Sequence, residues 1–272
     1  MTSINTNVGA LNARASAVRA TTKMEQAMER LSSGLRVNSA SDDAAGLAVA
    51  GKMESQLRGI NMSIRNAQDG VGLIQTAESG VNEIRNMVLR MRELAVQMAN
   101  GIYEDTPDRN NAQLEVTALI NQVTLIAENT RFNDVALLDG SFTTVNIQAG
   151  NTTAETIELS FVDMASSGLS IDGVDIATQS GATSAMGTLD SALETIASEQ
   201  ATMGSLINRL NFSISNQSKA SVMTEQAVGR IMDSDFATET TNLSKQQILN
   251  QAATSMLAQA NQSKQSILAL LQ

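Results

Sequence analysis

The chain has 272 residues, 28 Asp and Glu against 18 Lys and Arg, and neither His nor Cys. Without His and Cys, catalysis by Ser-His-Asp or Cys-His groups, thiolate zinc sites and disulfide frameworks are excluded, and a net charge of −10 makes nucleic acid and anionic membranes poor partners. A single Pro and an aromatic content of 2% favour long helices with small contact residues over a core built around large rings.

The N-terminal segment is expected to be helical, with apolar residues in steps of three and four. The first stretch of this spacing comprises Ile4, Val8, Leu11, Ala15 and Val18. The spacing shifts phase near Thr22 and resumes at Met24. The first thirty residues lack the continuous apolar stretch of a secretory signal, so if the chain leaves a cell, we expect it not to use the general secretory route. The sequence contains no run of about 18 apolar residues, so no membrane span is predicted.

A second helix start is expected in the sequence SASDDAAG, where Ser41 can cap and Asp42 and Asp43 lie at the positive helix end. The next residues, 46–53, match the phosphate-loop pattern G-x-x-x-x-G-K until Met53, which stands where a nucleotide site requires Ser or Thr. Because the expected context is also helical, we predict no nucleotide site.

Three long helices are predicted in the middle of the chain. An apolar seam runs from Met53 to Met98, and Gly101 and Pro107 end that helix. A second helix covers about 110–129, and a third carries its seam from Leu189 to Ile214. Three such helices can bundle, each covering the apolar stripe of another.

The segment 141–187 has a different character, rich in Ser, Thr and Gly, with five acids and no Lys or Arg. Val145 and Ile147 alternate with polar residues, as do Ile157 and Leu159, which predicts a β-hairpin. We expect this segment to be the most solvent-facing part of the chain.

The C-terminal segment mirrors the N-terminal one, with an apolar seam and almost no charge after Lys245. Its seam positions are Leu249, Ala253, Met256, Ala260, Ile267 and Leu270. Isolated helices are marginal in water. We therefore infer that both ends are mobile in a monomer and fold by burying their seams against other copies.

Four stretches of the sequence closely resemble bacterial flagellin. They are LSSGLRVNSASDDAAGLAVAGKM (31–53), RELAVQMANG (92–101), TRFNDVALLDG (130–140) and RIMDSDFATETTNLSKQQILNQAATSMLAQANQ (230–262). The resemblance covers about 1–140 and 188–272, in the family's order. The tail departs from it, because NQSKQSILALLQ lacks the Pro that many members carry.

The resemblance implies a mainly α fold, a long helical coiled-coil or bundle rod with one small β-hairpin region. Residues 1–40 and 236–272 would be terminal helices that pair in the filament core as an inner-tube domain. Residues 41–140 and 188–235 would form the helical rod domain, and 141–187 the short hairpin and variable surface segment. The insert is too short for the large outer domains of many members.

The function implied is that of a structural subunit, not an enzyme, that polymerises into the extracellular bacterial flagellar filament for motility. Its implied partners are other copies, a flagellin export chaperone, the filament cap and hook-filament junction proteins, with export through the flagellar type III apparatus. No catalytic, cofactor-binding or metal site is expected, nor any membrane insertion. The predicted subunit interface comprises Ile4, Val8, Leu11, Val18, Leu249, Met256, Leu257, Ile267, Leu268, Leu270 and Leu271.

A host Toll-like receptor is a further partner that the family implies. The recognition patch of the family falls here on Arg90, Leu94 and Glu115. Because this expectation comes from the resemblance alone, a reporter-cell assay is its test.

Three alternatives stay open on the sequence alone. A hook-filament junction protein shares the ends but diverges in LSSGLRVNSASDDAAG and RFNDVALLDG, which here look like flagellin. A needle-tip protein or adhesin predicts a monomer with ordered ends. A protease insertion is known in some members, but the absence of His excludes its zinc form.

Overall fold

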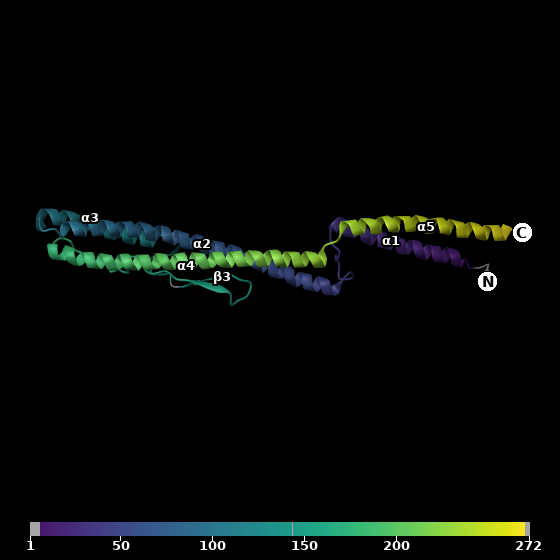
Figure 1. Ribbon diagram of the computed structural model, residues 1–272, viewed down its shortest axis with the longest axis horizontal. Helices are drawn as coiled ribbons and strands as arrows, with labels where there is room; N and C mark the ends of the chain where they lie inside the picture. Colours follow the sequence, from purple (N-terminus) through teal and green to yellow (C-terminus); the bar gives the residue numbers. More distant parts are fainter. Residues whose placement is uncertain (1–5, 143, 270–272) are drawn as a thin grey trace. The chain divides into compact units, whose positions relative to one another are not determined.

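The computed structural model describes residues 6–142 and 144–269, and it divides into two compact units. Unit 1 comprises residues 1–57 and 222–272, and unit 2 comprises 58–221. Most residues lie in helices (Figure 1), as the composition predicts, so the mainly α fold class is confirmed.

Unit 1 contains α1 (Val8–Ser33), the start of α2 (Ala44–Met98), the end of α4 (Gln179–Met232) and α5 (Phe236–Ala269). Helix α1 begins where the Asn7 side chain accepts a hydrogen bond from the Ala10 N–H (3.1 Å), and it ends at Gly34, whose left-handed φ of 74° suits glycine. The helix is continuous through Thr22, where the sequence predicts a phase shift.

Helix α2 begins nine residues earlier than its apolar seam indicates. The Asp43 carboxylate accepts the Gly46 N–H (2.8 Å), so Asp43 caps the helix rather than the predicted Ser41, whose Oγ contacts Ser39 Oγ instead. Residues 46–53 lie inside this helix and form no phosphate-binding loop.

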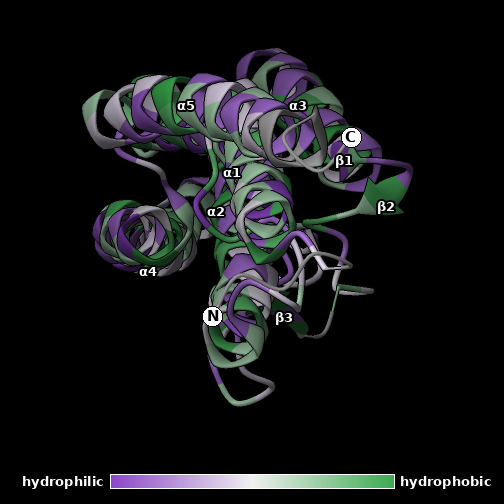
Figure 2. Cartoon of the chain, turned by 90° about the vertical axis from the view of Figure 1, so that its right-hand side faces the viewer, coloured by the Kyte–Doolittle hydropathy of each residue, from purple (hydrophilic) through white to green (hydrophobic). Residues whose placement is uncertain are grey.

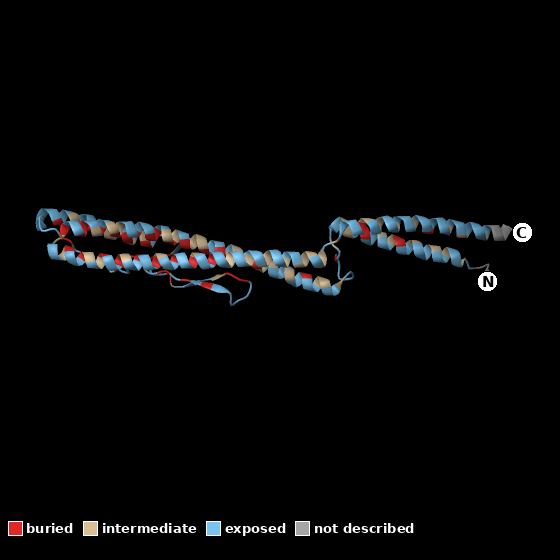
Figure 3. Ribbon diagram, in the orientation of Figure 1, coloured by how far each residue is buried: buried red, intermediate tan, exposed pale blue. Residues whose placement is uncertain are grey.

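In unit 2, α3 (Asn110–Asn129) and α4 both lie along α2. Ion pairs mark the contacts, from Arg90 of α2 to Glu115 of α3 and from Arg92 of α2 to Asp190 of α4. Buried residues are frequent on these helices in Figure 3 and sparse on α1 and α5. The core of unit 2 therefore holds most of the buried apolar side chains that the structure describes.

Two small antiparallel sheets accompany the helices of unit 2. Strands β1 (Arg131–Phe132) and β2 (Val135–Ala136) form one sheet, and β3 (Val145–Gln148) and β4 (Thr156–Leu159) form the other. In the second sheet Val145 pairs with Leu159 and Ile147 with Ile157, so the predicted hairpin is confirmed.

The segment 141–187 is not the solvent-facing part that its composition suggests. Leu159, Met164, Ile171 and Ile176 are fully buried, and the rings of Phe142 and Phe161 lie 5.2 Å apart. The prediction was wrong because the Ser, Thr and Gly content masks scattered apolar residues that complete the core of unit 2. Residues 179–187 also belong to α4 rather than to a loop.

Candidate subunit interface

Helices α1 and α5 pack against each other in antiparallel directions. The Asn7 side chain donates to the Ala260 carbonyl (3.1 Å), and the Asn250 side chain donates to Thr21 Oγ1 (2.7 Å). Residue numbers thus fall along α5 as they rise along α1. The two terminal segments therefore contact each other inside a single chain.

The contact between these helices is made mainly of small side chains. Buried or half-buried positions alternate in steps of three and four, the spacing of a coiled-coil seam. On α1 they are Ala10, Ala13, Ala17, Ala20, Met24, Ala27 and Leu31, and on α5 they are Leu243, Gln246, Asn250, Ala253, Leu257 and Ala260. Since an alanine buries far less apolar area than a leucine, the seam brings the backbones close but contributes little hydrophobic free energy.

The apolar residues predicted as the interface lie on the opposite face of α1. Val8, Leu11 and Val18 have exposed fractions of 55%, 55% and 59%. Each precedes a seam alanine by two positions, which is about 200° around a helix of 3.6 residues per turn. We call these three residues the α1 outer stripe. Both hydrophobic and hydrophilic segments are visible on the α1 and α5 ribbons in Figure 2.

On α5, Leu249 and Met256 are also exposed (45% and 64%), whereas Leu257 is half-buried in the seam. Met256 borders a groove of about 480 Å³ between α1 and α5, whose other lining residues include Gly9, Ser16 and Ala253. The lining of the groove is mostly apolar.

Five predicted interface residues cannot be placed by their side chains. The backbones of Ile267 and Leu268 lie in α5, but their side chains fall outside what the structure describes. Ile4, Leu270 and Leu271 lie outside the described residues altogether.

A polar cluster lies where the first loop meets the start of α5. The Arg30 guanidinium contacts the Glu239 carboxylate (3.3 Å) and the Asp42 carboxylate (3.8 Å). Hydrogen bonds from the backbone N–H groups of Ser39 and Asn38 hold the pKa of Asp42 below its ordinary value. These contacts link the loop that follows α1 to α5 within unit 1.

The proposed receptor patch lies in unit 2 and is split between surface and core. Arg90 Nε donates to Glu115 Oε1 (2.9 Å), and Arg90 Nη1 lies 3.2 Å from Glu93 Oε2. The bond to Glu115 raises the pKa of Arg90 above its ordinary value. Leu94, in contrast, is buried. The structure thus brings Arg90 and Glu115 together at the surface, with Leu94 beneath the surface in the core.

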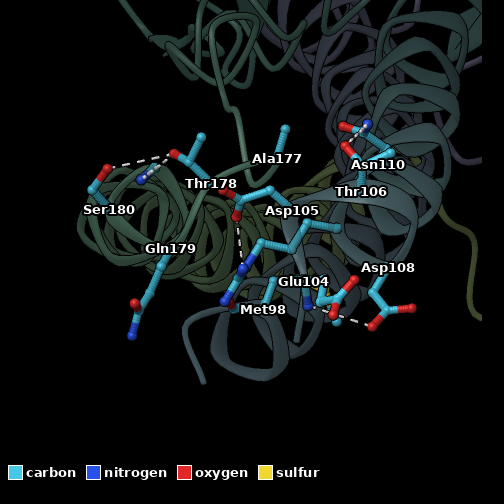
Figure 4. A network of polar contacts seen from close by, with 12 residues as sticks. Met98, Glu104, Asp105, Thr106, Asp108, Asn110, Ala177, Thr178, Gln179 and Ser180 are labelled. Carbon is cyan, nitrogen blue, oxygen red and sulfur yellow. Dashed lines mark hydrogen bonds and ion pairs between the residues drawn. The ribbon is translucent and has the colours of Figure 1, made fainter. Parts of the chain in front are cut away.

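A buried arginine that the sequence analysis missed fixes the loop after α2. Arg109 donates to the carbonyls of Met98 and Asn100 (2.9 Å each) and pairs with the Asp105 carboxylate (2.7 Å). Two of these partners, Met98 and Asp105, are labelled in Figure 4. These donors satisfy carbonyls at the C-terminal end of α2 and oppose its negative dipole. No sequence signal distinguishes this arginine from the exposed ones.

One buried carboxyl also belongs to unit 2. Glu199 of α4 accepts a hydrogen bond from the Val162 backbone, while its Oε1 has no partner, and burial raises its pKa. Among the described residues, no group of three or more acidic side chains could hold a metal ion, and no helix has the length and apolarity of a membrane span.

The sequence also contains the alanine seam of α1, which the predicted seam does not include. Its small residues recur at the same spacing as the larger stripe, so either set could have faced α5. The predicted seam comprises Val8, Leu11, Ala15 and Val18 instead. The structure assigns the two sets to opposite faces of the helix.

Comparisons with known proteins match both ends of the chain to one family. The family model of the bacterial flagellin N-terminal helical region matches residues 4–143. The family model of the bacterial flagellin C-terminal helical region matches residues 186–271.

Individual relatives cover nearly the whole chain. A flagellin of Halalkalibacterium halodurans is 40% identical, over 98% of this chain and 99% of its own. A flagellar filament 33 kDa core protein of Treponema phagedenis is 38% identical over the same shares of the two chains. The crystal structure of Bacillus cereus flagellin is 30% identical with a TM-score of 0.51, over 56% of this chain and 88% of that one.

Proposed function

Because the chain belongs to the bacterial flagellin family, we infer that it is the structural subunit of a bacterial flagellar filament, formed by polymerisation of identical copies. The family is structural and not enzymatic. A filament requires contacts that repeat head to tail without closing into a ring, so each copy must present two different complementary surfaces.

The observation that best supports this function is the exposed apolar surface of unit 1. The α1 outer stripe and the exposed Leu249 and Met256 lie on helices whose mutual contact is made mostly of alanine and polar residues. Such apolar surface is costly in water and is covered when chains associate. We propose that identical neighbours cover it.

The direct test is seeded assembly. Purified monomer is mixed with short filament fragments, and the product is measured by sedimentation and electron microscopy. We expect long filaments from the native chain. A monomer that stays soluble with intact seeds at every concentration would contradict the function.

The arrangement of the filament follows from the family resemblance and is part of the proposal. Residues 1–40 and 236–272 would form the inner tube, and 41–140 and 188–235 the outer rod, with 141–187 on the rod surface. The weak seam between α1 and α5 supports this, because it leaves the terminal helices free to gain stability from neighbours. Proteolysis of monomer and filament tests it, since only the monomer should be cut in both ends.

Export and assembly partners form the next part of the proposal. The subunit would leave the cell unfolded through the flagellar type III apparatus, with a chaperone on its C-terminal helix. It would then assemble in an extracellular filament under a cap and on junction proteins. The seam of α5, which includes Gln246 and Asn250 beside its apolar residues, supports a helix that a chaperone can hold separately. Binding of a purified export chaperone to α5 variants is the test.

A host Toll-like receptor is a second partner that a specific observation favours. The ion pair between Arg90 and Glu115 presents two charges at adjacent, exposed positions on α2 and α3. Reporter cells should respond to the monomer and respond less to the Arg90→Ala variant. No response to either protein at high concentration would remove this part of the proposal.

A further inference from the structure

Helix α4 presents one large aromatic side chain to solvent in unit 2. Phe212 is 76% exposed, although Leu210 two positions before it is fully buried. The positions three and four residues away on either side are polar and exposed. They are Asn208, Arg209, Ser215 and Asn216. An aromatic residue inside a polar rim has the anatomy of an interface hot spot.

The charge around Phe212 is opposite to that of the rest of unit 2. From Gln200 to Ala220, α4 carries Arg209 and Lys219 and no acid. Unit 2 as a whole has nine basic and nineteen acidic residues, a net charge of −10. A basic stretch on so acidic a unit suits an acidic partner surface.

An acidic stretch with a matching groove lies on α2. From Asn66 to Ile84, α2 carries Asp69, Glu78 and Glu83 and no base. Beside it, α2 and α3 border a groove of about 620 Å³. Its lining includes Gly72, Thr76, Ser79, Gly80, Glu83 and Ile126.

The groove has room for an incoming side chain at Gly72, but not at Gly80, where an added Cβ atom would lie 2.6 Å from Thr130 Oγ1. A Cβ atom added to Gly72 would meet no heavy atom within 4 Å. Arg131, the basic residue at the rim, donates its Nε hydrogen bond to the Glu128 carbonyl (3.2 Å). No residue of α4 lines the groove, so Phe212 and the groove are separate surfaces of unit 2.

We propose that a second copy of this chain inserts its Phe212 into the groove between α2 and α3, with Arg209 and Lys219 facing the acidic stretch of α2. The inference rests on the proposed function and adds a contact of unit 2 to those of the terminal helices. Because the two surfaces differ, the contact is heterologous, which is the type of contact that a filament requires.

The absence of native Cys allows a clean crosslinking test. Two single-cysteine variants are prepared, Ser215→Cys beside Phe212 and Ser79→Cys in the groove, and both replace exposed residues. They are mixed in equal amounts, assembled on seeds of native filament and treated with a short bismaleimide. We expect a crosslinked dimer in mixed filaments, and none in filaments of either variant alone or in mixed monomer.

A matched control uses Ser218→Cys in place of Ser215→Cys. Ser218 is also exposed but lies about 240° around the helix from Phe212, so its mixed filaments should give little dimer. Filaments that form without the Ser215–Ser79 dimer, or with equal dimer from Ser218, overturn the inference and leave the proposed function intact. Native chain that does not assemble at all contradicts both.

Substitution of Phe212 gives an independent measurement. Phe212→Ser should raise the critical concentration for assembly at least tenfold, with an unchanged circular dichroism spectrum because the side chain is exposed. Arg209→Glu should weaken assembly, and Glu83→Arg in the same chain should restore it. An unchanged critical concentration in Phe212→Ser overturns the inference.

Discussion

The two units of the molecule differ in where their apolar side chains lie. In unit 1, four of the five buried apolar residues of the described chain are alanines, while eleven large apolar residues are exposed. Unit 2 buries Leu, Ile, Val, Met and Phe in one continuous core. A domain of ordinary stability needs such a core. Unit 2 has an apolar core of this kind. Unit 1 is expected to bury its apolar side chains against neighbouring copies instead.

Charge follows the same division. Nine basic residues balance nine acidic ones in unit 1, so the net charge of −10 belongs entirely to unit 2. Copies of a neutral surface can pack closely without mutual repulsion, and a charged surface stays soluble. One chain can therefore have a complete apolar core in one unit and lack such a core in the other.

The largest effect is expected from a charge on the α1 outer stripe. Leu11→Asp should abolish seeded assembly, because a carboxylate would be buried against a neighbour without a partner. Unit 2 should keep its helical content and melting transition. Sedimentation after seeding measures assembly, with Leu11→Met as the matched control that should still form filaments. Normal filaments from Leu11→Asp would show that the stripe is not an interface.

Truncation of a core residue should show the opposite pattern. Ile196→Ala, at a fully buried position of α4, should lower the free energy of unfolding of unit 2 by about 2–5 kcal/mol. Leu11→Ala should change the stability of the monomer by less than about 0.5 kcal/mol. Thermal unfolding of the monomer compares the two. Equal losses would mean that unit 1 has a core of its own.

The buried Glu199 predicts a pH dependence confined to unit 2. Its pKa is raised in the folded chain, so the folded state holds the proton more tightly than the unfolded state. Stability from this group is present below the unfolded pKa and is lost as pH rises through the folded pKa.

Glu199→Gln removes that loss while keeping an acceptor for the Val162 N–H. The variant should be more stable than the native chain at pH 7, by an amount on the order of 1 kcal/mol, with a smaller difference at pH 4. Melting curves at the two pH values measure it. A greater gain at pH 4 than at pH 7 would contradict the assignment.

The smallest effect is expected at the surface of unit 2. Asp190→Asn breaks the exposed ion pair with Arg92, whose hydrogen bond lowers the pKa of Asp190. Exposed pairs contribute little because water and salt screen them. The melting temperature should shift by no more than its experimental error in 1 M salt. A large shift there would show that the pair matters more than its exposure suggests.

Much of the fold could be predicted from spacing alone. The seam from Met53 to Met98, the helix at 110–129 and the pairing of Ile147 with Ile157 all follow from apolar periods near 3.6 and 2. The burial of Met164 and Ile171 could not be predicted, because they lie in irregular backbone without a period.

The role of the α1 outer stripe as a subunit interface stays a prediction. The sequence shows its residues as an apolar set, but not that the set faces away from α5. Two stripes at the same spacing lie on one helix, and only the structure assigns the alanine stripe to α5. Phe212 carries no periodic signal, because its neighbours at helical spacing are polar.

The central claim is that unit 1 becomes stable only through other copies, and amide hydrogen exchange tests it most directly. In dilute monomer, amides of α1 and α5 should exchange rapidly while those of α2, α3 and α4 in unit 2 are protected. In the filament, α1 and α5 should become protected as well. Slow exchange of α1 and α5 in the monomer, equal to that of the unit 2 core, would contradict the account.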